Sequence, residues 1–296
     1  MLKPHEIPEC HAILIAGPTG AGKSRLAMDL AARMGSTIIN ADAMQVYGCW
    51  RILTARPLSD DEATVPHALY GHVGWQQDYS VGHWLTEIAN LLQGHAQAPP
   101  LIVGGTGLYF HALTAGLAPI PKIPAEIRAT GVKRLQDWGL IRFAEHLHQL
   151  DPRCRERLDP QNPARLLRAW EVLHATGKGL SDWQDETPPP LIKRKDTFAV
   201  LLNPDNAVLT ERITERVHQM VASGALEECA ASLTHWNPEL PSSKAIGARE
   251  LIAYLRGELT YSTALTKTVI ATRQYAKRQR TWFRSRMQDW LHITDC

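Results

Sequence analysis

Residues 17–24 read GPTGAGKS and match the phosphate-binding pattern G-x-x-x-x-G-K-[ST]. Five apolar residues precede the match at 12–16, and apolar residues recur at helical spacing after it. A strand that leads into such a loop and then into a helix lets the loop N–H groups and the helix dipole converge on an anion. The run therefore predicts a site for a phosphate chain, in which Lys23 supplies a mobile cation and Ser24 a ligand for Mg²⁺.

The composition excludes several classes of protein. The chain has 296 residues, 44% hydrophobic and 21% charged, which suits a globular protein of one large or two modest domains. It contains no apolar run long enough to span a membrane and does not begin like a signal peptide, so we expect a cytoplasmic protein. The five cysteines are scattered without a C-x-x-C pair, which argues against a disulfide framework or a zinc site. They are Cys10, Cys49, Cys154, Cys229 and Cys296.

Short apolar runs that alternate with amphipathic helices predict a parallel α/β sheet. Besides the strand at 12–16, we expect buried strands at 37–39, 101–103 and 198–202, and a capped helix at 84–92. The predicted fold class is therefore α/β, with a P-loop NTPase-like parallel sheet as its core.

A proline-bounded segment interrupts this pattern. Prolines 119, 121 and 124 open a stretch of mostly helical character that includes 164–175 and ends at the three prolines 188–190. We interpret residues 118–197 as a mostly helical insertion domain. The catalytic core then comprises residues 1–117 and 198–296, and its C-terminal part is expected to hold helices at 208–223, 244–255 and 263–289.

Polar residues follow two of the predicted strands. Ligands of parallel sheets bind at the carboxyl ends of the strands, so residues 40–42 and 104–107 are expected to face the phosphate loop. A carboxylate placed like Asp42 can contact Mg²⁺ or accept a proton from a nucleophile. The glycines of 104–107 suit a close approach of the backbone to a ligand, and Thr106 can donate a hydrogen bond to a phosphate or a base.

The C-terminal helix is strongly basic. Arg273, Lys277, Arg280 and Arg284 follow 4-3-4 spacing and so share one face, and no acidic residue interrupts the helix before Asp289. Such a stripe suits a nucleic-acid backbone, although a solvated charged face is the usual alternative. The insertion adds further cations, which are Arg153, Arg155, Arg157, Arg165 and Arg168. Two basic regions beside one phosphate loop favour a polyanionic second substrate.

These residues leave more than one class of function open. A small-molecule or nucleotide kinase would use the same loop to bind ATP, with the insertion as a lid. A nucleotide-dependent RNA-binding switch would use the loop and the basic helix without further chemistry.

Several segments, in order along nearly the whole chain, resemble the tRNA dimethylallyltransferases, also called tRNA isopentenyltransferases. The segments are GPTGAGKS at 17–24, NADAMQVY at 40–47, TARP at 54–57, YSV at 79–81, GGTGLY at 104–109, RLLRA at 165–169, AIG at 245–247 and TRQYAKRQ at 272–279. The resemblance is to the compact bacterial form. It implies transfer of a dimethylallyl group from dimethylallyl diphosphate to the exocyclic N6 amine of the adenosine 3′ of the tRNA anticodon, with Mg²⁺ as cofactor and the enzyme as a monomer.

The resemblance also implies roles for individual residues. Catalytic positions are Asp42 as general base, Thr106 against the adenosine, and Lys23 and Arg212 on the diphosphate. The diphosphate-binding loop is Gly17, Pro18, Thr19, Gly20, Ala21, Gly22, Lys23 and Ser24, with Ser24 at the metal. The implied tRNA contacts are Asp42, Ala43, Met44, Gln45, Thr106, Arg128, Ala164, Arg165, Leu166, Leu167, Arg168, Lys244, Ala245, Ile246, Gly247, Ala248 and Arg249. The insertion is expected to clasp the anticodon stem-loop while the adenosine is flipped out of its stack.

The chain departs from the family pattern at a few positions. Ala248 stands where the family usually has Tyr, Ala164 where it often has Gln, and Ala43 where it has Ser. Gly20-Ala21 replaces Ala-Ser in the phosphate loop, and residues 52–54 lack the usual Gly. Most of these positions are implied tRNA contacts, so they bear on recognition rather than on the chemistry.

Overall fold

The computed structural model describes residues 2–94 and 98–294 and divides the chain into two compact units. One unit comprises Met1–Thr114 with Leu191–Cys296, and the other comprises Ala115–Pro190. The sequence-based boundaries at 118 and 197 lie a few residues further along the chain. The difference at the second boundary arises because residues after Pro190 already pack with the sheet unit, where Arg194 donates a hydrogen bond to the Asp289 carbonyl.

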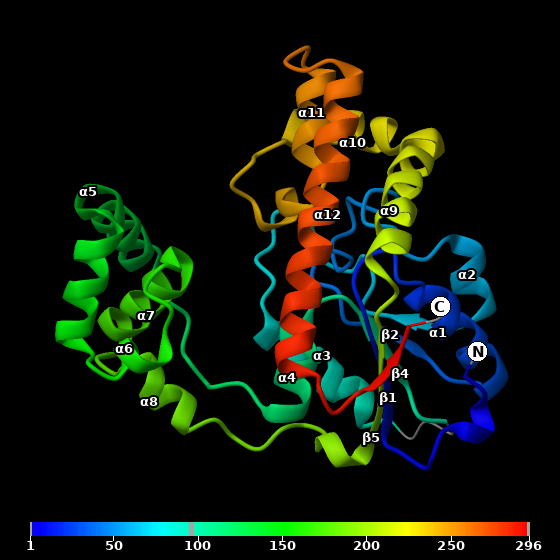
Figure 1. The fold of residues 1–296 in the computed structure, drawn as a ribbon, viewed down its shortest axis with the longest axis horizontal. Coiled ribbons are helices and arrows are strands. Elements are labelled where there is room, and N and C mark those ends of the chain that lie inside the picture. The colour runs from blue at the N-terminus through cyan, green and yellow to red at the C-terminus, as the bar shows by residue number, and fades with distance from the viewer. Residues whose placement is uncertain (1, 95–97, 295–296) are drawn as a thin grey trace. The chain divides into compact units, whose positions relative to one another are not determined.

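The described part of the first unit contains a parallel sheet with the strand order β3-β2-β4-β1-β5-β6 (Figure 1). The strands are β1 (Ala12–Ala16), β2 (Ile38–Asn40), β3 (His67–Ala68), β4 (Leu101–Gly104), β5 (Thr197–Leu202) and β6 (Leu291–Ile293). The four strands predicted from the sequence are confirmed within a residue or two, and all neighbours pair in parallel. The short outer strands β3 and β6 carry no continuous apolar run, which is why the sequence did not indicate them.

Helices cover both faces of the sheet. Alternate residues of β1 enter two different cores, Leu14 on one face and Ile13 and Ile15 on the other. Helix α1 (Lys23–Met34) packs on the second core, while α3 (Val81–Leu92) and α4 (Gly107–Ala115) pack on the first. Because both faces are buried, the central strands are apolar throughout rather than alternating.

A helical layer lies beyond the sheet in the same unit, formed by α9 (Asn206–Met220), α10 (Leu226–Ser232), α11 (Ala248–Leu255) and α12 (Tyr261–Arg286) (Figure 1). A short helix, α2 (Ser59–Thr64), follows the second strand-end loop. The predicted helix at 244–255 is wrong in its first turn, because Gly247 adopts a left-handed conformation with φ of 93° and α11 begins only after it. Helix α9 passes into a π-helical segment, Val221–Ala225, instead of continuing regularly to 223.

The second unit is helical, as the sequence predicted. Its elements are α5 (Ala125–Leu150), α6 (Cys154–Arg157), α7 (Pro163–Thr176) and α8 (Leu180–Asp185). Helix α5 is broken at Gly139, whose φ of 73° and ψ of 167° are not helical. The core of this unit is built around Phe143, Leu147, Leu166 and Trp170.

The positive charge predicted for this unit is partly neutralised. Arg153 forms ion pairs with Asp182 and Asp185, and Arg157 also pairs with Asp185. The sequence could not indicate this pairing, because about thirty residues separate the partners and only the packing of α6 against α8 joins them.

Two further expectations concern cysteines and membranes. Cys10, Cys49, Cys154 and Cys229 are free thiols, and Cys296 lies outside the described residues. Over residues 2–94 and 98–294, no helix is both long and apolar enough to cross a membrane.

Candidate active site

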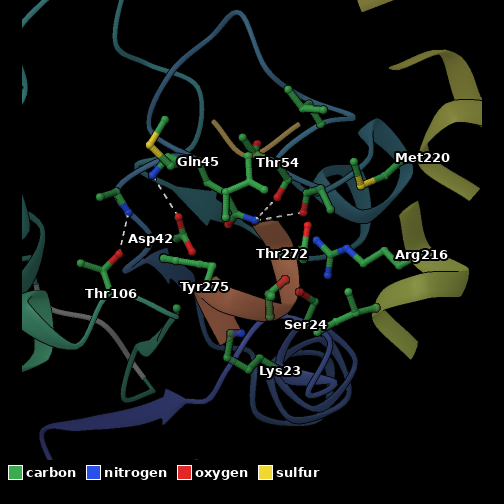
Figure 2. A pocket seen from close by; sticks show the side chains of 18 of the residues that line it. Lys23, Ser24, Asp42, Gln45, Thr54, Thr106, Arg216, Met220, Thr272 and Tyr275 are labelled. Atoms are coloured by element: carbon green, nitrogen blue, oxygen red, sulfur yellow. Dashed lines mark hydrogen bonds between the residues drawn. The ribbon is translucent and has the colours of Figure 1, made fainter. Parts of the chain in front are cut away.

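The carboxyl ends of β1, β2 and β4 meet at one cavity of about 400 Å³ (Figure 2). Lys23 and Ser24 from the loop after β1 line it, together with Asp42 from the segment after β2 and Thr106 from the turn after β4. In Figure 2, Lys23 and Ser24 lie at the bottom of the view, and Asp42 and Thr106 lie on its left. The sheet therefore brings together the polar segments that the sequence places far apart.

The loop after β1 is shaped as an anion site. Gly20 and Gly22 adopt left-handed φ angles of 82° and 89°, which turn the chain into the start of α1. The first helical hydrogen bond joins the Leu26 N–H to the Gly22 carbonyl, so the preceding amides of α1 lie before the helical ladder and are available to an anion. The Ala21 side chain instead packs in the core beneath the loop.

Lys23 is held against its own loop. Its ammonium donates hydrogen bonds to the carbonyl oxygens of Gly17 and Pro18, each at 2.9 Å. Burial lowers the pKa of Lys23 to about 8, and the nearby Asp42 carboxylate opposes this shift in part. A bound diphosphate would stabilise the ammonium form, because opposite charges at short distance favour the charged state.

We expect diphosphate binding to weaken with rising pH. The ammonium fraction of a group with a pKa of about 8 falls from about nine-tenths at pH 7 to about one-tenth at pH 9. The dissociation constant for inorganic diphosphate, measured by calorimetry, should therefore rise about tenfold over this interval. Lys23→Arg keeps its charge throughout, so its profile should show only the titration of diphosphate itself; an equal slope in parent and variant would contradict the assignment.

Asp42 is oriented by its own segment. Its Oδ1 atom accepts a hydrogen bond from the Met44 N–H at 2.9 Å, and its N–H donates to Asn40 Oδ1 at 2.8 Å. Asn40 is fully buried and also donates to the Leu69 carbonyl at 3.0 Å. With Oδ1 committed to the backbone, Oδ2 is the oxygen that can serve a ligand in the cavity.

The turn after β4 packs closely against other parts of the protein. A side chain on Gly104 would meet the Ala41 carbonyl oxygen at 2.0 Å, and one on Gly107 would meet the Trp282 ring at 2.2 Å. Protein groups therefore occupy the space beside these glycines, while the backbone of Gly104 also lines the cavity, so close approach to a ligand stays a prediction. Thr106 does line the cavity, and its hydroxyl oxygen accepts a hydrogen bond from the Ala43 N–H at 2.9 Å.

Arg216 is a cavity residue that the sequence reasoning missed. Arg212, the predicted diphosphate ligand, lines a neighbouring pocket at the phosphate loop together with Lys23 and Ser24. Arg216 lines both that pocket and the main cavity. Burial lowers the pKa of Arg216, and the Asp42 carboxylate opposes the shift. The available signal was helical periodicity, since Arg216 directly precedes the buried Val217 and lies one turn after Arg212.

The cavity also has an apolar wall. Ile213, Val217 and Met220 recur along one side of α9 and line it together with Leu53 and Ile246. Lys23, Arg216, Lys244 and Arg278 line the same cavity, so it combines cationic groups with a hydrocarbon surface. Such a cavity suits a small ligand that carries both a phosphate group and an apolar group.

The predicted tRNA contacts within this unit divide into two sets. Seven line the cavity, namely Asp42, Ala43, Met44, Gln45, Thr106, Lys244 and Ile246. The Gln45 amide nitrogen already donates to the carbonyls of Thr54 and Ala55, which leaves its amide oxygen for a ligand. Ala245 and Ala248 are buried in the core, so their side chains cannot contact tRNA. Gly247 provides the turn before α11, and Arg249 is exposed and donates to the Pro238 carbonyl.

The predicted tRNA contacts of the helical unit are also unequal. Arg128 and Arg168 both lie beside the buried carboxylate of Glu171, with N–O distances of 3.3 and 3.7 Å. Leu166 is buried in the core of the unit, so its side chain is not available to tRNA. The remaining positions, Ala164, Arg165 and Leu167, are exposed or partly exposed.

The four basic residues of the predicted stripe do share one face. Arg273, Lys277, Arg280 and Arg284 line a groove of about 600 Å³ between α9 and α12. Arg280 donates a hydrogen bond to the Asn206 side chain of α9 at 2.7 Å, which fixes it at the groove wall. The 4-3-4 spacing therefore predicted this surface correctly.

Mg²⁺ fits the polar end of the cavity only as a partner of a phosphate. Within residues 2–94 and 98–294, no group of three or more His, Cys, Asp or Glu side chains is placed to hold a metal ion. Ser24 lines the cavity next to Lys23 and offers a hydroxyl oxygen. Mg²⁺ bound through substrate phosphates and water needs few protein ligands, so one hydroxyl is consistent with it.

Fold and cavity together define a P-loop protein built for a phosphorylated substrate with a hydrocarbon part. The family model described as IPP transferase matches residues 45–286, and the model described as isopentenyl transferase matches residues 10–64. The chain belongs to the IPP transferase family.

Known relatives are similar to this chain over nearly its whole length. A tRNA dimethylallyltransferase of Cereibacter sphaeroides is 54% identical over 97% of this chain and 90% of the relative, and one of Paracoccus denitrificans is 52% identical over 97% and 96%. The solved tRNA isopentenylpyrophosphate transferase of Bacillus halodurans is 28% identical, with a TM-score of 0.68 over 97% of this chain and 90% of that one. A eukaryotic dimethylallyltransferase acting on tRNA is 27% identical, with a TM-score of 0.80 over 96% and 74%.

Proposed function

We infer that this protein transfers the dimethylallyl group of dimethylallyl diphosphate to the N6 amine of the adenosine 3′ of the anticodon in tRNA. The observation that carries this inference is the cavity in which a phosphate loop and an apolar wall lie beside an oriented carboxylate. An ATP-binding kinase site would need no apolar wall of this kind next to its phosphate loop.

The cationic residues at the phosphate loop would assist the departure of diphosphate. The loop amides, Lys23 and Arg216 would hold the diphosphate, with Arg212 in the neighbouring pocket at the same loop. Negative charge grows on the bridging oxygen as the carbon–oxygen bond breaks, and preorganised cations stabilise that charge most in a water-poor site. Mg²⁺, held by Ser24 and the phosphates, would supply further neutralisation when bound.

The apolar wall and Asp42 account for the transfer itself. Ile213, Val217 and Met220 would hold the hydrocarbon group and exclude water from its reacting carbon. The N6–carbon bond forms as the carbon–oxygen bond breaks, and the electron pair of that bond leaves with diphosphate. Asp42 Oδ2 would accept the N6 proton, while Thr106 would lie against the adenine.

The basic groove between α9 and α12 supports a tRNA substrate, because it offers four cations to a phosphate backbone. A base buried in a duplex or loop stack cannot reach such a cavity, so the adenosine must flip out, at a cost of a few kcal/mol. The helical unit would hold the anticodon stem-loop, and we expect the enzyme to act as a cytoplasmic monomer.

We expect single alanine variants of Arg273, Lys277, Arg280 and Arg284 to weaken tRNA binding. Each residue that contacts a phosphate should reduce the slope of log K against log salt by about one unit or somewhat less. Lys267 lies on the same helix outside the groove, so Lys267→Ala is the matched control. Slopes equal to that of the parent in all four variants would show that the groove is only a solvated surface.

A labelling experiment tests the function as a whole. The protein is incubated with tRNA and either labelled dimethylallyl diphosphate or γ-labelled ATP, transferred label is measured before digestion, and the tRNA from the prenyl reaction is then digested to nucleosides. We expect label from the prenyl donor in N6-dimethylallyladenosine. Transfer of phosphate from ATP instead would identify a kinase, and tRNA binding that responds to ATP without transfer would identify an RNA-binding switch.

A further inference from the structure

Gln279 of α12 bridges two of the three loops that form the cavity. Its side-chain oxygen accepts a hydrogen bond from the Thr19 N–H of the phosphate loop at 3.0 Å. Its side-chain nitrogen donates to the Gly105 carbonyl of the turn after β4 at 2.9 Å. The side chain is buried, and both ends of its amide therefore carry hydrogen bonds in a low-dielectric setting.

This contact leaves no room for a side chain at position 105. A side chain there would lie 2.2 Å from the Gln279 nitrogen and 3.3 Å from Asp42 Oδ2. The neighbouring Gly107 accommodates the Trp282 ring from the same helix. Helix α12 is therefore seated directly on the strand-end edge, where a small displacement of the helix moves the loops around Asp42.

A second branch reaches the third loop. The Thr106 hydroxyl oxygen accepts a hydrogen bond from the Ala43 N–H of the Asp42 segment, and the Thr106 N–H donates to the Ala41 carbonyl at 3.2 Å. The phosphate loop, the Asp42 segment and the turn after β4 are thus joined through Gln279 of α12 and through Thr106. Strands β1, β2 and β4 fix where these loops begin, but these contacts fix how the loops face one another.

We propose that Gln279 is a positioning residue that sets the distance between the diphosphate loop and the Asp42–Thr106 side of the cavity. This proposal rests on the proposed function, since the two sides would hold the leaving group and the general base. It predicts that loss of the bridge impairs the transfer step more than the binding of either substrate. A displacement near 1 Å between reacting groups costs about a hundredfold in rate.

The test uses Gln279→Met, which keeps the size of the side chain and removes both hydrogen bonds. Thr268→Val is the matched control, because Thr268 is a buried polar residue of α12 whose hydroxyl bonds only within the helix, to the Ala264 carbonyl. We expect kcat to fall about 10- to 100-fold in Gln279→Met. The KM values for dimethylallyl diphosphate and tRNA should stay within about threefold, and Thr268→Val should resemble the parent.

Hydrogen exchange of the unliganded protein provides a readout that does not depend on activity. Peptides that cover residues 17–24 and 101–109 should exchange faster in Gln279→Met, while the rest of α12 stays protected. Unchanged exchange in these peptides together with kcat within twofold of the parent would overturn the proposal. An inactive parent enzyme would instead refute the proposed function, which separates the two failures.

Gln279→Glu tests the bridge in a second way and serves if the methionine variant does not fold. Glutamate can still accept from the Thr19 N–H but, when ionised, cannot donate to the Gly105 carbonyl. Exchange should then stay slow at 17–24 and increase at 101–109, with kcat lowered at saturating dimethylallyl diphosphate. Equal protection of both peptides and an unchanged kcat in this variant would also overturn the proposal.

Discussion

Replacing Asp42 with asparagine is expected to lower kcat for prenyl transfer by about 10²- to 10⁴-fold, the range for loss of a general base. The amide oxygen can still accept from the Met44 N–H, so the local segment should keep its shape. Without the carboxylate, the N6 proton has no basic acceptor in place as the new bond forms. The measurement is single-turnover transfer of labelled dimethylallyl groups to tRNA.

Two controls separate this effect from a loss of binding or folding. Below the pKa of Lys23, inorganic diphosphate should bind Asp42→Asn at least as tightly as it binds the parent, because removal of a nearby negative charge strengthens an anion site while the ammonium stays protonated. Asp60→Asn, on the exposed surface of α2, should leave transfer unchanged. Turnover of Asp42→Asn within a few-fold of the parent would mean that another group accepts the proton.

Replacing Arg216 with methionine is expected to lower kcat/KM for dimethylallyl diphosphate by about 10²- to 10³-fold, the range for loss of one preorganised group that stabilises developing charge. Arg216 lines the main cavity, and burial strengthens its interaction with a bound anion. Both KM and kcat should change, because the diphosphate is charged before transfer and gains charge during it. Steady-state kinetics with saturating tRNA measures both parameters.

Arg212→Met is the matched comparison. It removes the same type of side chain one helical turn away, from a position that lines the neighbouring pocket at the phosphate loop but not the main cavity. We expect a smaller loss, expressed mainly in KM, because solvent screens a more peripheral charge. A larger loss in Arg212→Met than in Arg216→Met would restore the sequence-based assignment of the diphosphate arginine.

Much of the site was predictable from the sequence, because the residues that shape each loop lie close together in the chain. The phosphate loop depends on glycines at defined positions and on a lysine and a serine at the start of a helix, which sequence alone displays. Asp42 and Thr106 were predictable because both follow buried strands, and parallel strands end at the same edge of the sheet. The sequence could not show which of Arg212 and Arg216 lines the main cavity, because that depends on how α9 is rotated over the cavity.

Burial explains the other differences. Ala245, Ala248 and Leu166 lie in motifs that imply tRNA contact, yet their side chains pack in cores. The arginines at 153 and 157 count as free charge in a composition but meet carboxylates across α6 and α8. The residue type alone does not show whether an apolar side chain lies in a core or whether an arginine forms an ion pair. Both depend on neighbours that are distant in the chain.

The sequence by itself determined the phosphate loop, the central parallel strands and the shared basic face of α12. Each of these depends on residues within one or two turns of helix or one strand, where periodicity and glycine positions are sufficient. Only the tertiary structure decided that Arg216 enters the cavity, that α9 supplies its apolar wall, and that Gln279 joins loops 260 and 174 residues away in the chain. Such contacts arise from packing between elements, whose rotation and distance no local pattern encodes.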